Sequence, residues 1–184
     1  MKKHEIITLL SESPLKTDRT ILRPINDEDI DEFLEHIAGA LTLYGTELEE
    51  LYKEKCKEQI YSDSGITFSV RLTESNEYIG YFELKELDIE PEIGIDLIES
   101  FQNQGFGYEV CQTAVHFIFE KTDIDTLKYN CFRNNNASLR LAEKLGAVQV
   151  SEKVLLNNLQ KAGLSQEIID ESVGFDIIVH EIQK

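Results

Sequence analysis

The sequence predicts a single α/β domain built on a mixed β-sheet, and three observations support this. Its 184 residues, 41% of them hydrophobic, suffice for one domain that buries a core. No internal repeat, low-complexity tract or linker interrupts the chain. Strand-like and helix-like segments follow one another as strand, two helices, three strands, helix, strand, helix and two strands, an order that does not fit a repeating βαβ array.

Hydrophobic periodicity defines the elements of the first third of the chain. Residues 1–16 predict a loose lead-in or a short helix. A strand is expected over 19–25, where apolar side chains alternate with polar ones. Asn26 is a good N-cap for a helix over 26–38 with acidic residues in its first turn. A second helix is expected over 46–60, because its apolar residues keep a helical period.

The rest of the chain alternates between strands and helices. Residues 73–77 form a turn-rich hairpin connection between two strands. A helix over 109–121 carries one apolar stripe, and a helix over 135–145 ends at Gly146. The polar segment 153–173 leaves room for one or two short helices. The strands of this part are expected over 66–72, 78–87, 92–98, 127–132, 148–152 and 175–182.

Composition limits the partners and the compartment. A formal net charge of −17 argues against direct contact with nucleic acid, and either a solvated acidic surface or attraction of a cationic substrate explains it. No run of 18 apolar residues predicts a membrane span, and the short apolar stretch near the N-terminus does not fit a signal peptide. Three scattered cysteines without Cys-x-x-Cys spacing argue against a zinc site. We therefore expect a cytoplasmic protein without a metal.

Residues 102–108 predict an anion-binding turn between a strand and a helix. The first-turn N–H groups of a helix have no intrahelical partner and lie at its positive end. Gly105 and Gly107 lack Cβ atoms, so a phosphate oxygen can approach the backbone. Val110 stands where a dinucleotide motif has its third glycine, and no Walker A sequence occurs. The turn indicates a diphosphate-bearing cofactor, with an ordinary glycine turn as the alternative.

Four stretches in register resemble the GNAT acetyltransferases. The Gln-x-x-Gly-x-Gly pattern of the turn resembles their acetyl-CoA loop. Residues 17–24 resemble the opening Thr-x-Arg-Leu-x-Leu-Arg-Pro of the branch that includes ribosomal-protein N-terminal acetyltransferases, with Thr20 in place of a leucine. Residues 77–81 resemble the hairpin strand before the cofactor strand, and 135–147 the Asn-x-Ala-Ser helix. Together these stretches cover residues 17–152.

The resemblance implies a fold and a cosubstrate. The expected fold is one GNAT domain over 1–184, with about seven mostly antiparallel strands and a splayed parallel pair, flanked by helices. The cosubstrate is acetyl-CoA, whose pantetheine arm pairs with strand backbone and whose diphosphate rests on the turn. Because Asn103 and Tyr108 occupy positions that are often basic, backbone amides carry more of the phosphate contact. The residues expected to bind it are Ile95, Asp96, Leu97, Gln102, Asn103, Gln104, Gly105, Phe106, Gly107, Tyr108 and Asn135.

Acetyl transfer to an amine requires loss of an ammonium proton, stabilisation of an oxyanion and departure of a thiolate. Glu92 matches a family position proposed as the base, with a solvated surface carboxylate as the alternative, and Asp96 is a second candidate near the ammonium. Many family members have a tyrosine acid, but Ala142 stands at the matching position. The resemblance therefore implies Ser138 as the acid, although a serine there also bonds local backbone. A backbone N–H near Leu97 would hold the oxyanion.

The expected function is acetyl-CoA-dependent transfer to a primary amine, which is a protein N-terminus, a small amine or an antibiotic. Two alternatives stay open: a non-catalytic acyl-CoA-binding module, and a different nucleotide-binding α/β protein. Residues 153–173 are expected to border the acceptor site or a homodimer contact. His36 and His116 are expected on helix surfaces, and Cys111 and Cys131 in the core.

Overall fold

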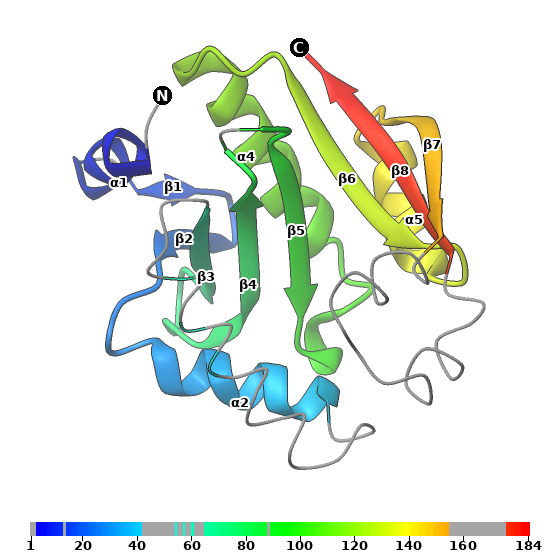
Figure 1. Ribbon diagram of the computed structural model, residues 1–184. Coiled ribbons are helices and arrows are strands. Elements are labelled where there is room, and N and C mark those ends of the chain that lie inside the picture. Colours follow the sequence, from blue (N-terminus) through cyan, green and yellow to red (C-terminus); the bar gives the residue numbers. More distant parts are fainter. Residues whose placement is uncertain are drawn as a thin grey trace.

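The computed structural model has one mixed sheet at its centre (Figure 1). It describes residues 3–12, 14–41, 54, 57, 60, 65–87, 89–154 and 176–184. The strands are β1 (Leu15–Lys16), β2 (Thr20–Pro24), β3 (Ile66–Leu72), β4 (Tyr78–Lys85), β5 (Glu92–Leu97), β6 (Thr126–Phe132), β7 (Val148–Val154) and β8 (Asp176–Gln183). The helices are α1 (Lys3–Glu12), α2 (Ile30–Leu41), α4 (Phe106–Lys121) and α5 (Asn136–Lys144), with a 3-10 turn, η2 (Glu99–Phe101).

One pair of neighbouring strands is parallel. In the described sheet, of order β1-β2-β3-β4-β5-β6-β8-β7, the other neighbours pair antiparallel. β5 and β6 pair only at Glu92 with Lys128 and at Ile93 with Tyr129. Their ladder ends there, so later backbone groups of β5 face an opening between the strands. The expected mostly antiparallel sheet with one splayed parallel pair is confirmed.

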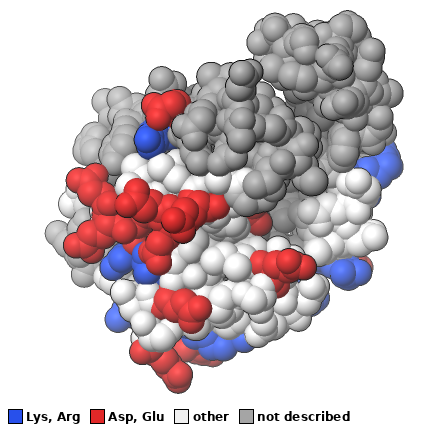
Figure 2. Space-filling model, turned by 90° about the horizontal axis from the view of Figure 1, so that it is seen from below, with Lys and Arg blue, Asp and Glu red and all other residues white. Residues whose placement is uncertain are grey.

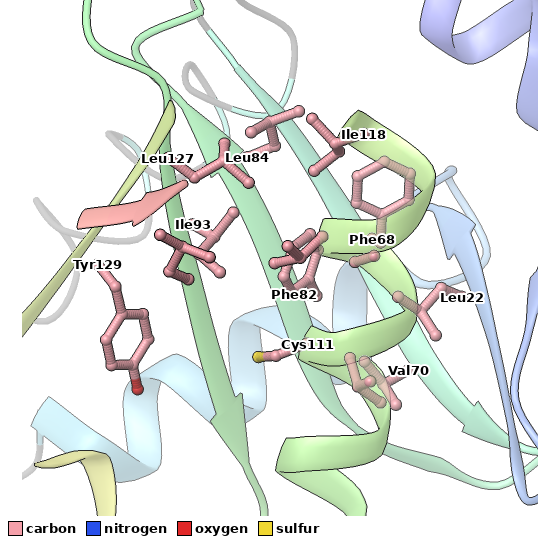
Figure 3. Packing of buried hydrophobic residues seen from close by; sticks show 14 of the residues in the cluster. Leu22, Phe68, Val70, Phe82, Leu84, Ile93, Cys111, Ile118, Leu127 and Tyr129 are labelled. Atoms are coloured by element: carbon pink, nitrogen blue, oxygen red, sulfur yellow. The ribbon is translucent and has the colours of Figure 1, made fainter. Parts of the chain in front are cut away.

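The main hydrophobic core lies between the sheet and α4, with α1 on the same face (Figures 1 and 3). Alternate strand residues turn to this face, as the period of two requires: Phe82 and Leu84 on β4 and Ile93 on β5. They belong to one cluster with Cys111 and Ile118 of α4, and all five are at most 4% exposed. Packing in this core fixes the position of β5 relative to the N-terminal turn of α4.

Helix α2 covers the opposite face of the sheet. Phe33 and Ile37 belong to a smaller apolar cluster, against which Tyr81 of β4 packs. The Phe33 and Tyr81 rings meet edge to face with centroids 5.0 Å apart. Acidic side chains gather on the lower side of the molecule, where α2 lies, as Figure 2 shows. A solvated acidic surface thus accounts for at least part of the net charge.

A buried carboxylate fixes α2 to the sheet. Asp29, which is 0% exposed, accepts hydrogen bonds from Arg23 of β2 at 2.8 Å and from Arg71 of β3 at 2.7 and 3.0 Å. Burial alone would raise the pKa of Asp29, but these hydrogen bonds hold it below its usual value. Glu32 of α2 also contacts Arg71. The network therefore sets the position of α2 over β4 and β5.

Several element boundaries differ from the sequence-based expectation. Of the two alternatives for residues 1–16, the short helix is the one observed, over Lys3–Glu12, where Ile6 and Leu10, four residues apart, are each only 2% exposed. Helix α2 begins at Ile30 rather than at residue 26, because Asn26 Oδ1 accepts from the Glu28 N–H at 2.8 Å and so forms a turn before the helix. Strand β1 was not expected, since two residues carry no periodic pattern.

Helix α4 begins at Phe106, three residues before the expected start, so the end of the turn that was predicted to bind an anion is the first turn of the helix. The expected helix over 46–60 lies mostly outside the described residues, although Glu54, Lys57 and Ile60 are helical. The segment 153–173 lies outside them beyond Val154, the last residue of β7.

Candidate active site

A pocket of about 300 Å³ lies beside β5, where β5 and β6 separate. It is bounded by the end of β5, the turn before α4, one residue of β6 and helix α5. The lining residues that the sequence predicted are Ile95, Asp96, Leu97, Gln102, Asn103, Gly105, Gly107, Tyr108, Asn135 and Ser138. The lining residues that it missed are Tyr129, Ala137, Arg140, Leu141 and Lys144. The predicted residues Glu92, Gln104 and Phe106 do not line it.

The turn before α4 presents free amides to this pocket. Gly105 is the N-cap of α4 with φ 87°, a left-handed conformation that favours glycine, and no side chain caps the helix there. The first backbone bond of the helix joins the Glu109 N–H to the Gly105 carbonyl at 3.1 Å. A Cβ on Gly107 would lie 3.8 Å from the Leu97 and Leu141 side chains, so the backbone sits close to both pocket walls. The arrangement suits an anion.

Two side chains of the turn have structural contacts instead. Phe106 is 7% exposed and packs in the core against Phe101, with ring centroids 6.1 Å apart. Gln104 Nε2 donates to the Ser100 carbonyl at 2.6 Å. Only the backbone of these two residues can therefore serve an anion.

Gln102 fastens the turn to β5. Its Nε2 donates to the Leu97 carbonyl oxygen at 2.7 Å. That carbonyl is engaged, and the Asp96 carbonyl faces Gly80 of β4, so a ligand that pairs with β5 must rely mainly on the backbone of Ile95. The N–H of Leu97, the expected oxyanion donor, interacts with the Asp96 side chain, an interaction that acts to lower the pKa of that carboxyl.

Arg19, just before β2, supports the turn from outside the pocket. Its Nε donates to Glu109 Oε2 at 2.8 Å, its NH1 donates to the Gln104 carbonyl at 3.2 Å, and its guanidinium lies 4.0 Å from the Phe106 ring centroid. Burial would raise the pKa of Glu109, but hydrogen bonds from Thr17 and Arg19 lower it. Arg19 is part of the stretch 17–24, but no local pattern reveals its distant partners.

Helix α5 brings Ser138 and Asn135 to the pocket. Asn135 caps the helix, because its Oδ1 accepts from the Ser138 N–H at 3.0 Å, as expected of an N-cap asparagine. The Ser138 Oγ lies 2.6 Å from the Tyr129 hydroxyl of β6. Burial raises the pKa of Tyr129, although the Ser138 contact opposes the rise. A pair of hydroxyl-bearing side chains is therefore part of the pocket lining.

Arg140 and Lys144 add positive charge to the pocket wall. They are one helical turn apart on α5, and both line the pocket. Among the described residues neither forms an ion pair. In a chain of net charge −17, two unpaired cations beside free helix amides favour a phosphate ligand.

Glu92 lies at the paired start of β5, outside the pocket. Its carboxylate accepts from Asn130 Nδ2 and lies 3.3 Å from Lys85 Nζ, and its side chain is 19% exposed. Strand alternation turns it to the same face as Asp96. The structure thus does not bring Glu92 to the pocket that holds Ser138.

Asp96 instead meets a histidine from α2. His36 Nε2 lies 3.7 Å from Asp96 Oδ2, and His36 Nδ1 lies 3.3 Å from the Tyr78 hydroxyl. Burial lowers the pKa of His36, and Asp96 opposes the change; burial raises the pKa of Asp96, and His36 opposes it. The His36 side chain is only 11% exposed, so its expected place on the helix surface is wrong. Its spacing from Phe33 and Ile37, which face the sheet, is the signal that was missed.

The expected positions of His116 and Cys131 are confirmed. His116 has a side chain that is 81% exposed, and Cys131 is 6% exposed in the core. Across the described ranges, no three His, Cys, Asp or Glu side chains gather as they would around a metal ion. No helix within those ranges has the length and apolarity needed to span a membrane.

Comparisons with known proteins agree with this geometry. The model of the acetyltransferase (GNAT) domain family matches residues 19–148. The uncharacterized N-acetyltransferase YoaA of Bacillus subtilis (strain 168) is 27% identical over 191 residues, which cover 92% of this chain and 96% of that protein.

Two solved structures share the fold. The spermidine N-acetyltransferase from Vibrio cholerae, in complex with CoA and spermine, has a TM-score of 0.66 and 16% identity over 89% of this chain and 95% of that one. The RimL ribosomal L7/L12 alpha-N-protein acetyltransferase, in complex with coenzyme A, has a TM-score of 0.69 and 14% identity over 92% and 96%. Since the family model spans every residue that lines the pocket, the chain belongs to the GNAT acetyltransferase family and is an acyltransferase.

Proposed function

We propose that this chain transfers an acetyl group from acetyl-CoA directly to a primary amine. The amine nitrogen attacks the thioester carbonyl, a C–N bond forms, the C–S bond breaks, and the electron pair stays on sulfur as the thiolate. The observation that carries the proposal is the pocket, which joins free helix amides, unpaired strand backbone and a hydroxyl pair. No covalent intermediate with the enzyme is needed, because both substrates can bind together.

The pocket gives each part of acetyl-CoA a partner. The amides of residues 103–108 hold the diphosphate at the positive end of α4, and Arg140 and Lys144 add charge-assisted contacts to phosphate. The pantetheine arm runs along β5, beside Ile95 and Asp96. This direction brings the sulfur to Ser138, which hydrogen-bonds the departing thiolate.

Two carboxylates compete for the role of base. Glu92 is the candidate from the family resemblance, but Lys85 and Asn130 engage it outside the pocket. Asp96 lines the pocket, is 43% exposed and has a raised pKa, which suits proton abstraction. We favour Asp96, with His36 beside it, and keep Glu92 as the alternative.

The acceptor is proposed only as a primary amine. The named neighbours act on spermidine and on a ribosomal protein, so both a small polyamine and a protein N-terminus are candidates here. We further propose that the protein works in the cytoplasm, and that the segment 153–173 borders the acceptor site or a homodimer contact. Deletion of that segment without a change in acceptor range or assembly would refute the last point.

Two measurements test the proposal. A thermal-shift panel should show stabilisation by acetyl-CoA and CoA but not by NAD or ATP, because a ligand stabilises only the state that binds it. A thiol-release assay should then show amine-dependent turnover with spermidine or with peptides that have free N-termini. Binding of acetyl-CoA without amine-dependent release would favour the non-catalytic acyl-CoA-binding module, and a preference for NAD or ATP would favour a different nucleotide-binding protein.

A further inference from the structure

Two pocket hydroxyls come from different elements and meet at 2.6 Å. Tyr129 lies on β6 and Ser138 on α5, and both line the pocket. The structure alone allows either oxygen to donate, so the direction of the hydrogen bond must come from chemistry. If the proposed function holds, Tyr129 has a role in it that no local sequence pattern indicates.

Tyr129 is the better donor of the pair. A phenol, with a pKa near 10 in water, is a stronger acid than an alkyl hydroxyl. Burial raises the pKa of Tyr129 further, so the hydroxyl keeps its proton into alkaline solution. The residue is only 3% exposed, and in Figure 3 its hydroxyl points away from the apolar cluster that holds its ring. The donor is therefore fixed in place by packing.

Ser138 is then left with one free hydrogen. Its backbone N–H is bound by Asn135 Oδ1, which fixes the start of α5, while its oxygen accepts from Tyr129. Ser138 also bonds to the Cys131 thiol, an interaction that opposes the rise that burial causes in the pKa of that thiol. A thiol sulfur is a weak acceptor, whereas a thiolate is a strong one. A coenzyme A thiolate in the pocket would take the serine hydrogen in preference.

We propose that Tyr129 is a positioning residue that acts through Ser138. By donating to the Ser138 oxygen, it directs the serine hydrogen into the pocket, toward the sulfur of coenzyme A. When the C–S bond breaks, the electron pair moves to sulfur and the serine O–H bonds to it, while the Tyr129 proton stays on its own oxygen.

This role explains how the chain works without a tyrosine acid on α5. Ala142, at the family's tyrosine position, is 0% exposed and packed in the core. The Ser138 hydroxyl, oriented by Tyr129 of β6, bonds to the thiolate instead of a tyrosine on α5. No net proton transfer through Tyr129 is required, because a thiol with a pKa near 8.5 can leave as the thiolate.

The test compares the binding of CoA and desulfo-CoA by isothermal titration from pH 7 to pH 10. Desulfo-CoA lacks the sulfur, so the ratio of the two affinities isolates the thiolate contact from other titrations of the protein. A hydrogen bond that lowers the pKa of the bound coenzyme A thiol by one unit makes the thiolate bind about tenfold tighter than the thiol. We therefore expect the ratio of CoA affinity to desulfo-CoA affinity to rise about tenfold in the wild type. The titratable groups near the hydroxyl pair are Cys131, Cys111 and His180. Their effect on the binding of the two ligands cancels in the ratio of affinities.

Y129F and S138A should each remove most of this rise, and the double variant should match S138A, because Tyr129 acts only through the serine. Y81F is the matched control, because Tyr81 lies on β4, packs against the apolar cluster of α2 and does not line the pocket. It should behave as the wild type. Unchanged desulfo-CoA affinity in each variant shows that the pocket is folded.

Four results would overturn the assignment. If the affinity ratio rises in Y129F as much as in the wild type, Tyr129 is not needed to orient the Ser138 hydroxyl. If the ratio rises fully in S138A but not in Y129F, Tyr129 itself contacts the sulfur. If the wild type binds CoA tightly but the affinity ratio does not change with pH, the contact between Ser138 and the thiolate is disproved, while the proposed function is unaffected. Failure of the wild type to bind either ligand would defeat the proposed function, and this inference with it.

Discussion

The Nε2 atom of His36 lies 3.7 Å from Oδ2 of Asp96, which joins helix α2 to the strand that lines the cofactor pocket. The Tyr78 hydroxyl lies 3.3 Å from the other ring nitrogen of His36. Three elements thus converge on one carboxylate, on the face of β5 opposite the core. This relationship separates two candidates for the base, Asp96 and Glu92.

D96N should lower kcat/KM for amine acetylation by about 10²- to 10⁴-fold, the usual effect of losing a general base. E92Q should have a much smaller effect, because its carboxylate is engaged by Lys85 and Asn130 outside the pocket. Steady-state thiol release with one amine measures both. The reverse order of effects would return the role of base to Glu92.

The pH dependence should shift when His36 is replaced. A base must be unprotonated, so kcat/KM falls as the pH drops through the Asp96 pKa. His36 acts to lower that pKa, so H36N should raise it and move the acid limb to higher pH. H116N, at a histidine whose side chain is 81% exposed on α4, should leave the profile unchanged. If the acid limb of the kcat/KM profile does not shift in H36N, His36 does not influence the pKa of the catalytic base.

R19A should weaken CoA binding by about tenfold, because the turn loses hydrogen bonds and its preorganised shape. R19K should recover only part of the affinity, since lysine lacks the planar fork. The salt dependence of binding should stay as in the wild type, because Glu109 neutralises Arg19. Titration of CoA at two salt concentrations checks this, with K121A as the control. Affinity equal to wild type in R19A would show that the turn holds its shape alone.

R140A and K144A should each weaken CoA binding by about tenfold, as expected for lost charge-assisted phosphate contacts. Unlike the Arg19 variants, they should also reduce the salt dependence, because unpaired cations on the pocket wall are screened. Repeating the titration with dephospho-CoA identifies which phosphate each residue contacts. An unchanged affinity for CoA in both variants would contradict their proposed role.

D29N should destabilise the fold by about 3 kcal/mol at pH 7, because it removes the buried carboxylate charge that pairs with Arg23 and Arg71. The pKa of Asp29 is lowered on folding, so its contribution is present above the unfolded pKa and is lost as the pH falls through the folded one. The difference between D29N and wild type in urea unfolding should therefore shrink in acid. E32Q, at a half-exposed partner of Arg71, should cost less than about 1 kcal/mol.

Local patterns predicted the parts of the fold and site that local chemistry decides. Gly105 and Gly107 marked the turn before α4, and Asn135 capped α5, because backbone conformation and capping depend on neighbours in sequence. The splayed pair at β5 and β6 came from the family resemblance rather than from periodicity.

The missed residues act over long sequence separations. Arg19 reaches Glu109 across 90 positions, and Asn130 reaches Glu92 across 38. Tyr129 reads as an ordinary core residue of an alternating strand, and only the path of α5 brings a serine to its hydroxyl. Such contacts depend on the topology of the sheet, which no spacing along the chain encodes.

Amide chemical shifts on titration with CoA test the central claim most directly. The largest changes should fall on residues 103–108, with further changes at Ile95 and Asp96, because the diphosphate and the pantetheine arm bind there. Amides near Glu90 and Thr126, which line a separate pocket, should not move. Saturable shifts confined to that second pocket, or none at residues 103–108, would contradict the account.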